Sequence, residues 1–338
     1  MSSRRRSSED IVFPKAANSY VAGRHRRVCS GDDMTFRISD SLLYGTLYFY
    51  PDPVAAADGE RAGGSGFLLG WGLEDGTDRC SLWAVTNRHI IDGGSTAIRV
   101  NAKAGGVEII DTVEPEWYFH ETADLAVRPI ALSDDVHQFN YIANNWLISK
   151  EWVEALDIGP GDPCFTVGRF VRNDGRQRNT PTARFGQIAQ MNGEPLRAEG
   201  LPPQDSVLVE CRSIGGFSGS PVFLWLDGQF YRPSIQGKTA PDGTKLFQGV
   251  FPQDQWLLGV CWCMIPSWEP VCDEAGQQVP SGWQVPANTG IMGVVPAWHL
   301  QQLIESGPAA PRRKEIEAAI ARLTADTPPS IIETGGGG

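Results

Sequence analysis

Short apolar runs separated by glycine and proline constrain the fold of this 338-residue chain more than any other feature. The runs are rich in Val, Ile, Phe, Tyr and Trp, and the turn formers between them are plentiful, with 38 glycines and 24 prolines. Short β-branched and aromatic segments bounded by such residues are typical of strands. Helical periodicity is scarce, so the pattern predicts an all-β protein. The longest strongly apolar stretch, residues 257–265, is too short to span a bilayer as a helix.

The segment 215–221 reads Gly-Gly-Phe-Ser-Gly-Ser-Pro and indicates a nucleophilic serine on a glycine-rich turn. A serine hydroxyl is a weak nucleophile, so acyl transfer needs a base to take its proton and a carboxylate to orient that base. Upstream, His89 follows one apolar run and Asp124 precedes another. We therefore predict Ser218 as nucleophile, His89 as base and Asp124 as its orienting carboxylate. The backbone N–H groups of Gly216 and Ser218 are the predicted oxyanion hole.

These residues resemble the trypsin-like serine peptidases of the chymotrypsin fold, and the bacterial HtrA-type branch more than the digestive enzymes. The resemblance covers roughly residues 41–305 and includes three further segments: 64–67, 161–168 and 289–296 with the apolar positions that follow it. It implies two packed six-stranded antiparallel β-barrels, chymotrypsin-like, with a C-terminal helix. It also implies that the site lies between the barrels, with His89 and Asp124 from the first and Ser218 from the second.

The expected organisation has five parts. They are a basic N-terminal arm at 1–40, a first barrel at 41–135, a linker at 136–158, a second barrel with closing helix at 159–305, and a short helix with a Gly-rich tail at 306–338. We expect strands at 42–50, 66–72, 82–86, 97–100, 107–113 and 125–129, and then at 163–168, 182–190, 206–210, 220–226, 256–264 and 290–295. Two long polar loops, 227–255 and 266–289, are expected to border the cleft as substrate-selecting segments or a lid. The short helix is expected to pack on the second barrel or to meet another chain.

The family's pattern implies walls for the first specificity pocket at Arg212, Ser213 and Ile214 and on the strand around Trp262 and Cys263. Arg212 suggests an acidic substrate side chain, although an outward-facing, ion-paired arginine fits the sequence equally well. The cleavage specificity therefore stays open.

Two departures from the family's pattern bear on regulation. Phe217 stands where trypsin zymogens hold the acidic residue that pairs with a new N-terminus, so residues 11–12 are not expected to be an activation site. The PDZ-like module that follows many HtrA-type peptidase domains is also not found after residue 311. A regulatory protein partner, loop ordering or oligomerisation would then have to control activity.

Net charge and cysteine content limit which partners and which cellular compartment the sequence predicts. The net charge is −11, although residues 1–27 hold seven basic against two acidic side chains. The arm is either a solvated tail or a docking segment, and the acidic remainder disfavours nucleic acid as a partner. The seven cysteines are odd in number and scattered, which favours reduced thiols in the core over a disulfide framework. We predict no metal and no cofactor. The N-terminus lacks the apolar region of a secretory signal, so a cytoplasmic location without membrane association is expected.

The sequence thus predicts an intracellular serine endopeptidase that cleaves a protein or peptide substrate through an acyl-enzyme intermediate. The alternative is a catalytically silent binding or assembly subunit on the same scaffold. An esterase of the α/β-hydrolase type is disfavoured because its triad runs in the order Ser, Asp, His.

Overall fold

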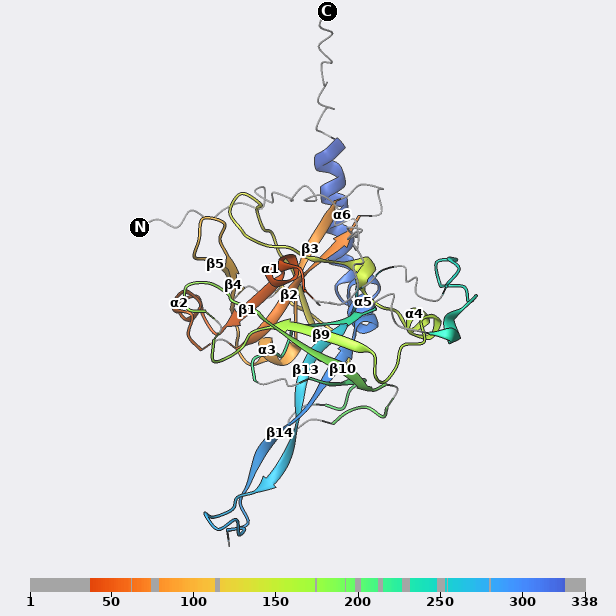
Figure 1. The fold of residues 1–338 in the computed structure, drawn as a ribbon. Helices are drawn as coiled ribbons and strands as arrows, with labels where there is room; N and C mark the ends of the chain where they lie inside the picture. Colours follow the sequence, from red (N-terminus) through yellow and green to blue (C-terminus); the bar gives the residue numbers. More distant parts are fainter. Residues whose placement is uncertain are drawn as a thin grey trace, which may run out of the picture.

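Two β units and a pair of C-terminal helices form the structure, a computed structural model (Figure 1). It describes residues 37–325 except 62, 74–78, 113–115, 174, 192, 198–201, 212–214, 227–231, 248–252, 254 and 280. The predicted all-β fold is confirmed. The predicted arm at 1–36 and the tail after 325 lie outside the described residues, and the predicted domain boundaries stay predictions.

The first unit is a sheet of eight strands, β1 to β8. Their bounds are Thr46–Tyr50, Gly64–Gly72, Cys80–Thr86, Ala97–Asn101, Val107–Asp111, Tyr118–Phe119, Ala126–Pro129 and Ile142–Ala143. Antiparallel pairing runs in the order β5-β4-β1-β2-β3-β7-β6, and β8 pairs in parallel with β2. Over the described residues this path stays open between β5 and β6, where a closed barrel was expected. β6 is only two residues long, so it has little backbone with which to pair further.

The second unit is a closed six-stranded antiparallel barrel, as predicted. Its strands are β9 (Pro163–Gly168), β10 (Thr182–Gln190), β11 (Val207–Glu210), β12 (Pro221–Trp225), β13 (Gln255–Pro270) and β14 (Gln284–Pro296). They close in the order β10-β11-β14-β13-β12-β9. Closure removes the unpaired strand edges that an open sheet would expose. One continuous apolar core joins the two units, since Phe67 and Trp83 of the first sheet cluster with Phe223 and Trp262 of the barrel.

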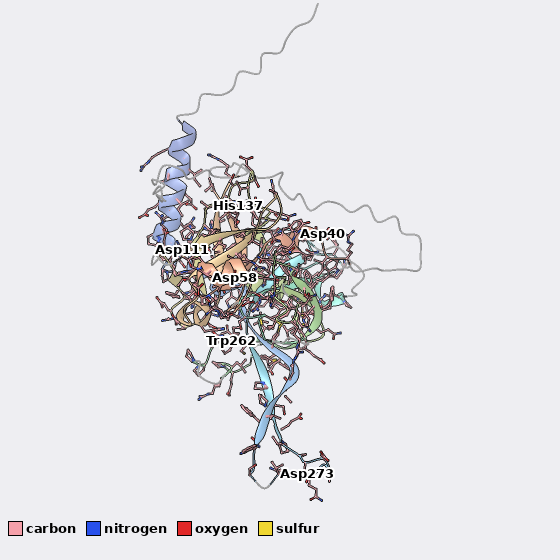
Figure 2. All side chains as sticks on the ribbon, turned by 90° about the vertical axis from the view of Figure 1, so that its left-hand side faces the viewer. Asp40, Asp58, Asp111, His137, Trp262 and Asp273 are labelled. Atoms are coloured by element: carbon pink, nitrogen blue, oxygen red, sulfur yellow. The ribbon has the colours of Figure 1, made fainter. Side chains whose placement is uncertain are left out.

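The expectation of a loop at 266–289 is wrong, because β13 and β14 continue out of the barrel as a two-stranded ribbon that pairs as far as Pro270 with Gln284. Figure 2 shows this ribbon projecting from the body, with Trp262 near its base and Asp273 at its far end. Prolines at 266, 270 and 286 made the segment resemble a loop. Each strand of a two-stranded ribbon needs donors on one side only, so proline is tolerated on the other. The other expected loop, 227–255, is described in part and holds the 3-10 helix η2 (Pro233–Ile235).

Short helix α1 (Asp40–Tyr44) precedes β1. Four more short helices lie between later strands: α2 (Pro53–Asp58), α3 (Arg88–Asp92), η1 (Asn144–Trp146) and α4 (Lys150–Ala155). Two more follow β14, namely α5 (Ala297–Glu305) and α6 (Ala310–Ala325). The predicted closing helix is α5, which buries Leu300, Leu303 and Ile304. None of the helices in the described ranges has the length and apolarity needed to cross a membrane.

Helix α6 packs on the first sheet and on α5, whereas packing on the second barrel was expected. The guanidinium of Arg313 lies 5.7 Å from the ring centroid of Trp71 in β2, and Arg312 pairs with Glu116 at 2.8 Å. Ile320 is buried on the same helix. The amphipathic spacing therefore identified the helix correctly but not the surface that it covers. In both figures α6 leaves the body on the side opposite the ribbon.

Candidate active site

His89 sits at the start of α3, directly after the buried strand β3. Asp124 lies between β6 and β7, the strand that pairs with β3, so the sheet brings the two residues together. One carboxylate oxygen of Asp124 accepts the backbone N–H of His89 at 2.9 Å, and the other lies 2.5 Å from Nδ1 of the imidazole. Asn87 adds a third tie, because its side-chain amide donates to the carbonyl of Asp124 at 2.8 Å. The predicted His–Asp pair is therefore present in the structure.

Two residues that the sequence did not single out hold the Asp124 turn in place. The ring nitrogen Nδ1 of His120 accepts the backbone N–H groups of Thr122 at 3.2 Å and Ala123 at 2.9 Å. From the second unit, Oε1 of Gln204 accepts the backbone N–H of Asp124 at 2.6 Å. Burial of the imidazole, with the neighbouring His299, holds the pKa of His120 below its usual value. This keeps Nδ1 unprotonated and able to accept both bonds. No motif marked either residue, because both act through backbone groups.

Ser218 lies on a tight turn before β12 whose glycines are required by geometry. Gly216 has φ +97° and Gly219 has φ +85°, values that residues with a Cβ rarely adopt. A Cβ at Gly219 would overlap the carbonyl oxygen of Ser65, and one at Gly216 would lie 2.7 Å from Val171. Between them, Phe217 is buried in the core and anchors the turn with its ring. Phe217, which stands where trypsin zymogens hold a carboxylate, is thus a core residue.

The Ser218 hydroxyl donates to the backbone carbonyl of Trp262 at 3.4 Å. Across the described part of the chain, no hydrogen bond joins it to His89, so the structure shows two of the three predicted side chains in direct contact. One observation places the Ser218 turn beside the segment that carries His89. A Cβ built on Gly64 would touch both the side chain of Ile90, which adjoins His89, and the backbone oxygen of Ser218 at 3.2 Å. A hydroxyl rotates freely, and catalytic hydrogen bonds are often long without substrate.

The predicted oxyanion-hole amides are the backbone N–H groups of Gly216 and Ser218. Among the described residues, no acceptor is found for the backbone N–H of Gly216 or of Ser218. Free, adjacent N–H groups on a rigid turn are the arrangement that stabilises a developing oxyanion.

The predicted pocket walls are only partly described. Arg212, Ser213 and Ile214 lie outside the described residues. Trp262 is buried and donates from Nε1 to the hydroxyl of Ser206 at 3.0 Å, so its backbone and not its ring faces the site. Cys263 is half-buried, and this burial raises the pKa of its thiol to about 12, with the nearby Asp124 charge adding to the effect. Both residues stay predictions as substrate contacts.

Other features of the site bear on ligands. The described ranges contain no group of three or more His, Cys, Asp or Glu side chains placed to hold a metal ion. A cavity of about 210 Å³ lies behind Asp124, lined by Thr122, Ala123, Gln204, Asp205 and His299 among others. A larger one of about 460 Å³ lies by Trp152 and Trp256 and contains no predicted site residue.

The first sheet carries the His–Asp pair and the closed barrel carries the glycine-bounded serine, which is the arrangement that the resemblance to trypsin-like peptidases implies. Residues 64–231 match the family model described as the trypsin-like peptidase domain. The predicted family is thereby confirmed.

Solved structures that match this chain include the following three. The MamO protease domain of Magnetospirillum magneticum is 14% identical over 78% of this chain and 96% of its own, with a TM-score of 0.40. The HtrA-type protease AlgW, solved with a decapeptide, is 17% identical over 80% and 67%, with a TM-score of 0.40. An inactive serine-to-alanine mutant of Rv3671c from M. tuberculosis H37Rv is 14% identical over 88% and 98%, again at 0.40. No curated protein matches the chain.

Proposed function

We propose that this chain is a serine endopeptidase that cleaves a protein or peptide substrate through an acyl-enzyme intermediate. The observation that carries the proposal is the two-point contact between His89 and Asp124. A carboxylate that fixes the imidazole by its ring nitrogen and its backbone leaves the other ring nitrogen free to act as a base.

The proposed reaction gives a role to each of the predicted catalytic and oxyanion-hole residues. His89 Nε2 takes the proton of Ser218 Oγ as that oxygen attacks the scissile carbonyl, and Asp124 stabilises the imidazolium. The N–H groups of Gly216 and Ser218 bind the oxyanion. His89 then gives its proton to the leaving amine, and a water molecule repeats the sequence to release the acid and restore the serine. To begin, the Ser218 hydroxyl turns from the Trp262 carbonyl toward His89, which leaves that carbonyl free to accept an N–H of the substrate.

We place the activity inside the cell. Six cysteines are described, all six are free thiols, and four are buried. A set of unpaired thiols in the core suits a reducing compartment. Detection of the active chain only in an oxidising compartment, by fractionation, would contradict this assignment.

Active-site labelling with a fluorophosphonate probe, mapped by mass spectrometry, tests the function. The wild type is expected to carry the label on Ser218, and Ser218→Ala is expected to lose it while keeping its circular dichroism spectrum. Ser220→Ala is the matched control, because Ser220 lies two residues on and is fully buried. This variant should keep the label. A folded wild type that takes no label contradicts the proposal and is the result expected of a silent binding subunit.

A further inference from the structure

Ser65, the second residue of β2, contacts the nucleophile turn twice from a fully buried position. Its backbone N–H donates to the carbonyl of Ser218 at 2.9 Å, and its hydroxyl donates to the carbonyl of Gly216 at 2.7 Å. Neither bond belongs to a β-ladder. A residue of the first sheet therefore binds the turn of the second unit by hydrogen bonds on both sides of Phe217.

The two carbonyls that Ser65 holds belong to the peptide planes on either side of the Phe217–Ser218 peptide, which carries one of the predicted oxyanion amides. A carbonyl and the N–H of the following residue share one rigid peptide plane. The bonds from Ser65 fix the Gly216–Phe217 and Ser218–Gly219 peptide planes. Between these two planes lies the Phe217–Ser218 peptide, which carries the Ser218 N–H. If the Gly216 carbonyl turned over, it would lose the bond from Ser65 and leave a buried hydroxyl without its acceptor, which is unfavourable.

The Ser65 hydroxyl is itself held in one rotamer. It accepts the backbone N–H of Arg169, the residue after β9, at 2.9 Å. Its only proton must then point to Gly216, because a hydroxyl has a single donor. The backbone oxygen of Ser65 is fixed as well, since it accepts the hydroxyl of Thr86 at 2.7 Å. All of the polar groups of Ser65 are used.

The segment 169–181 that supplies this N–H is fixed to the first sheet by a buried arginine. Arg99 in β4 donates to the carbonyls of Gly175 and Arg176 and, from Nε, to Oδ1 of Asn179 at 2.7 Å. Asn179 returns a bond from Nδ2 to the Arg99 carbonyl at 2.7 Å. A side chain of the same segment, Val171, lies where a Cβ on Gly216 would fall. The groups that surround the Ser218 turn are thus held in place by residues of the first sheet.

We propose that Ser65 is a positioning residue that holds the oxyanion amides of Gly216 and Ser218 in their orientation. This role rests on the proposed function. It touches neither substrate nor reacting atoms and acts through the Gly216 and Ser218 carbonyls. Acylation therefore depends on a hydroxyl that belongs to the opposite β unit.

Ser65→Ala and Ser81→Ala form a matched pair for the test. Ser81 is also a buried serine of the first sheet, and its hydroxyl accepts the Trp83 indole N–H at 3.0 Å, away from the turn. Two quantities are measured in each variant: the rate constant of labelling by the fluorophosphonate probe, and the amide cross-peak of Gly216 in protein labelled with [¹⁵N]glycine. Loss of one oxyanion donor slows catalysis about 10²- to 10³-fold, and its misalignment is expected to slow labelling about 10- to 100-fold.

Ser65→Ala should slow labelling and move the Gly216 cross-peak, while Ser81→Ala should leave both close to wild type. Equal labelling of Ser65→Ala and wild type, an unmoved cross-peak, or equal losses in both variants would overturn the inference. A wild type that takes no label contradicts the proposed function alone, because the cross-peak still decides the role of Ser65. Should Ser65→Ala fail to fold, Thr86→Val is the second variant, with a smaller change in the same direction expected and no change overturning the role.

Discussion

Asp124 holds His89 at two points, the backbone N–H at 2.9 Å and the ring nitrogen Nδ1 at 2.5 Å. One carboxylate thus fixes both where the imidazole lies and which of its nitrogens carries the proton. The pair is set within a single sheet, because β3 leads into His89 and β7 follows Asp124. In the proposed reaction, the imidazole is therefore already oriented before substrate binds.

Asp124→Asn is expected to lower the rate of fluorophosphonate labelling by about 10⁴-fold with the fold intact, because the amide favours the wrong histidine tautomer. Asp205→Asn is the control. Asp205 also pairs with a histidine, His299, at 3.0 Å but lies outside the predicted triad. A rate in Asp124→Asn within a few-fold of Asp205→Asn would contradict the assigned role.

Gly219→Ala should lower the free energy of unfolding by more than about 2 kcal/mol and abolish labelling. The left-handed backbone costs an alanine about 1 to 2 kcal/mol, and the overlap of its Cβ with the Ser65 carbonyl adds to this. Gly215→Ala is the control, since a Cβ there meets nothing within 4 Å. Urea unfolding measures both variants. Equal stabilities would show that the turn is not packed as described.

Stability should fall below neutral pH because of His120. Burial and His299 lower the pKa of His120, so the unfolded chain binds this proton at a higher pH than the folded chain does. The contribution to stability is full above the ordinary histidine pKa of about 6.5 and is lost as the pH drops below it. Glu121 and the Gln302 side chain oppose the shift and limit its size.

His120→Asn isolates this effect, because an asparagine oxygen can replace Nδ1 as acceptor for the N–H groups of Thr122 and Ala123 but does not titrate. Urea unfolding at pH 7.5 and pH 5.5 is expected to show a larger loss for the wild type than for the variant. Identical pH dependence in the two proteins would rule out His120 as the titrating group.

Thiol alkylation should distinguish Cys272 from Cys263. The thiolate is the reactive form, and burial raises the pKa of Cys263 to about 12, so this thiol stays protonated at pH 8. Cys272 is exposed on the ribbon. Iodoacetamide on the native protein should modify Cys272 and spare Cys263, as read by peptide mass spectrometry. Rapid modification of Cys263 would show that the base of the ribbon opens in solution.

The sequence predicts the elements whose patterns are local. The strands 163–168 and 182–190 have the predicted bounds because each is a continuous run between turn residues. The glycines of the Ser218 turn were informative for the same reason, because a positive φ angle favours glycine at that position itself. The pairing of His89 with Asp124 could not be predicted from local patterns alone. That prediction depended on the family's pattern.

What depends on distant backbone groups could not be predicted. Gln204 reaches Asp124 from the other unit through a main-chain N–H, and nothing in the residues around either one indicates the contact. The ribbon was hidden by its prolines, which interrupt strand patterns although only one side of each strand is paired. Helix α6 contacts Trp71 and Glu116 of the first unit, and nothing in its own sequence indicates these partners.

The structure of the fluorophosphonate adduct tests the convergence of the three side chains most directly. We expect phosphorus bonded to Ser218 Oγ, the phosphoryl oxygen within hydrogen-bond distance of the N–H groups of Gly216 and Ser218, and Nε2 of His89 beside Oγ with its bond to Asp124 kept. An adduct on another residue, or one in which His89 stays out of reach of Ser218, would contradict the account.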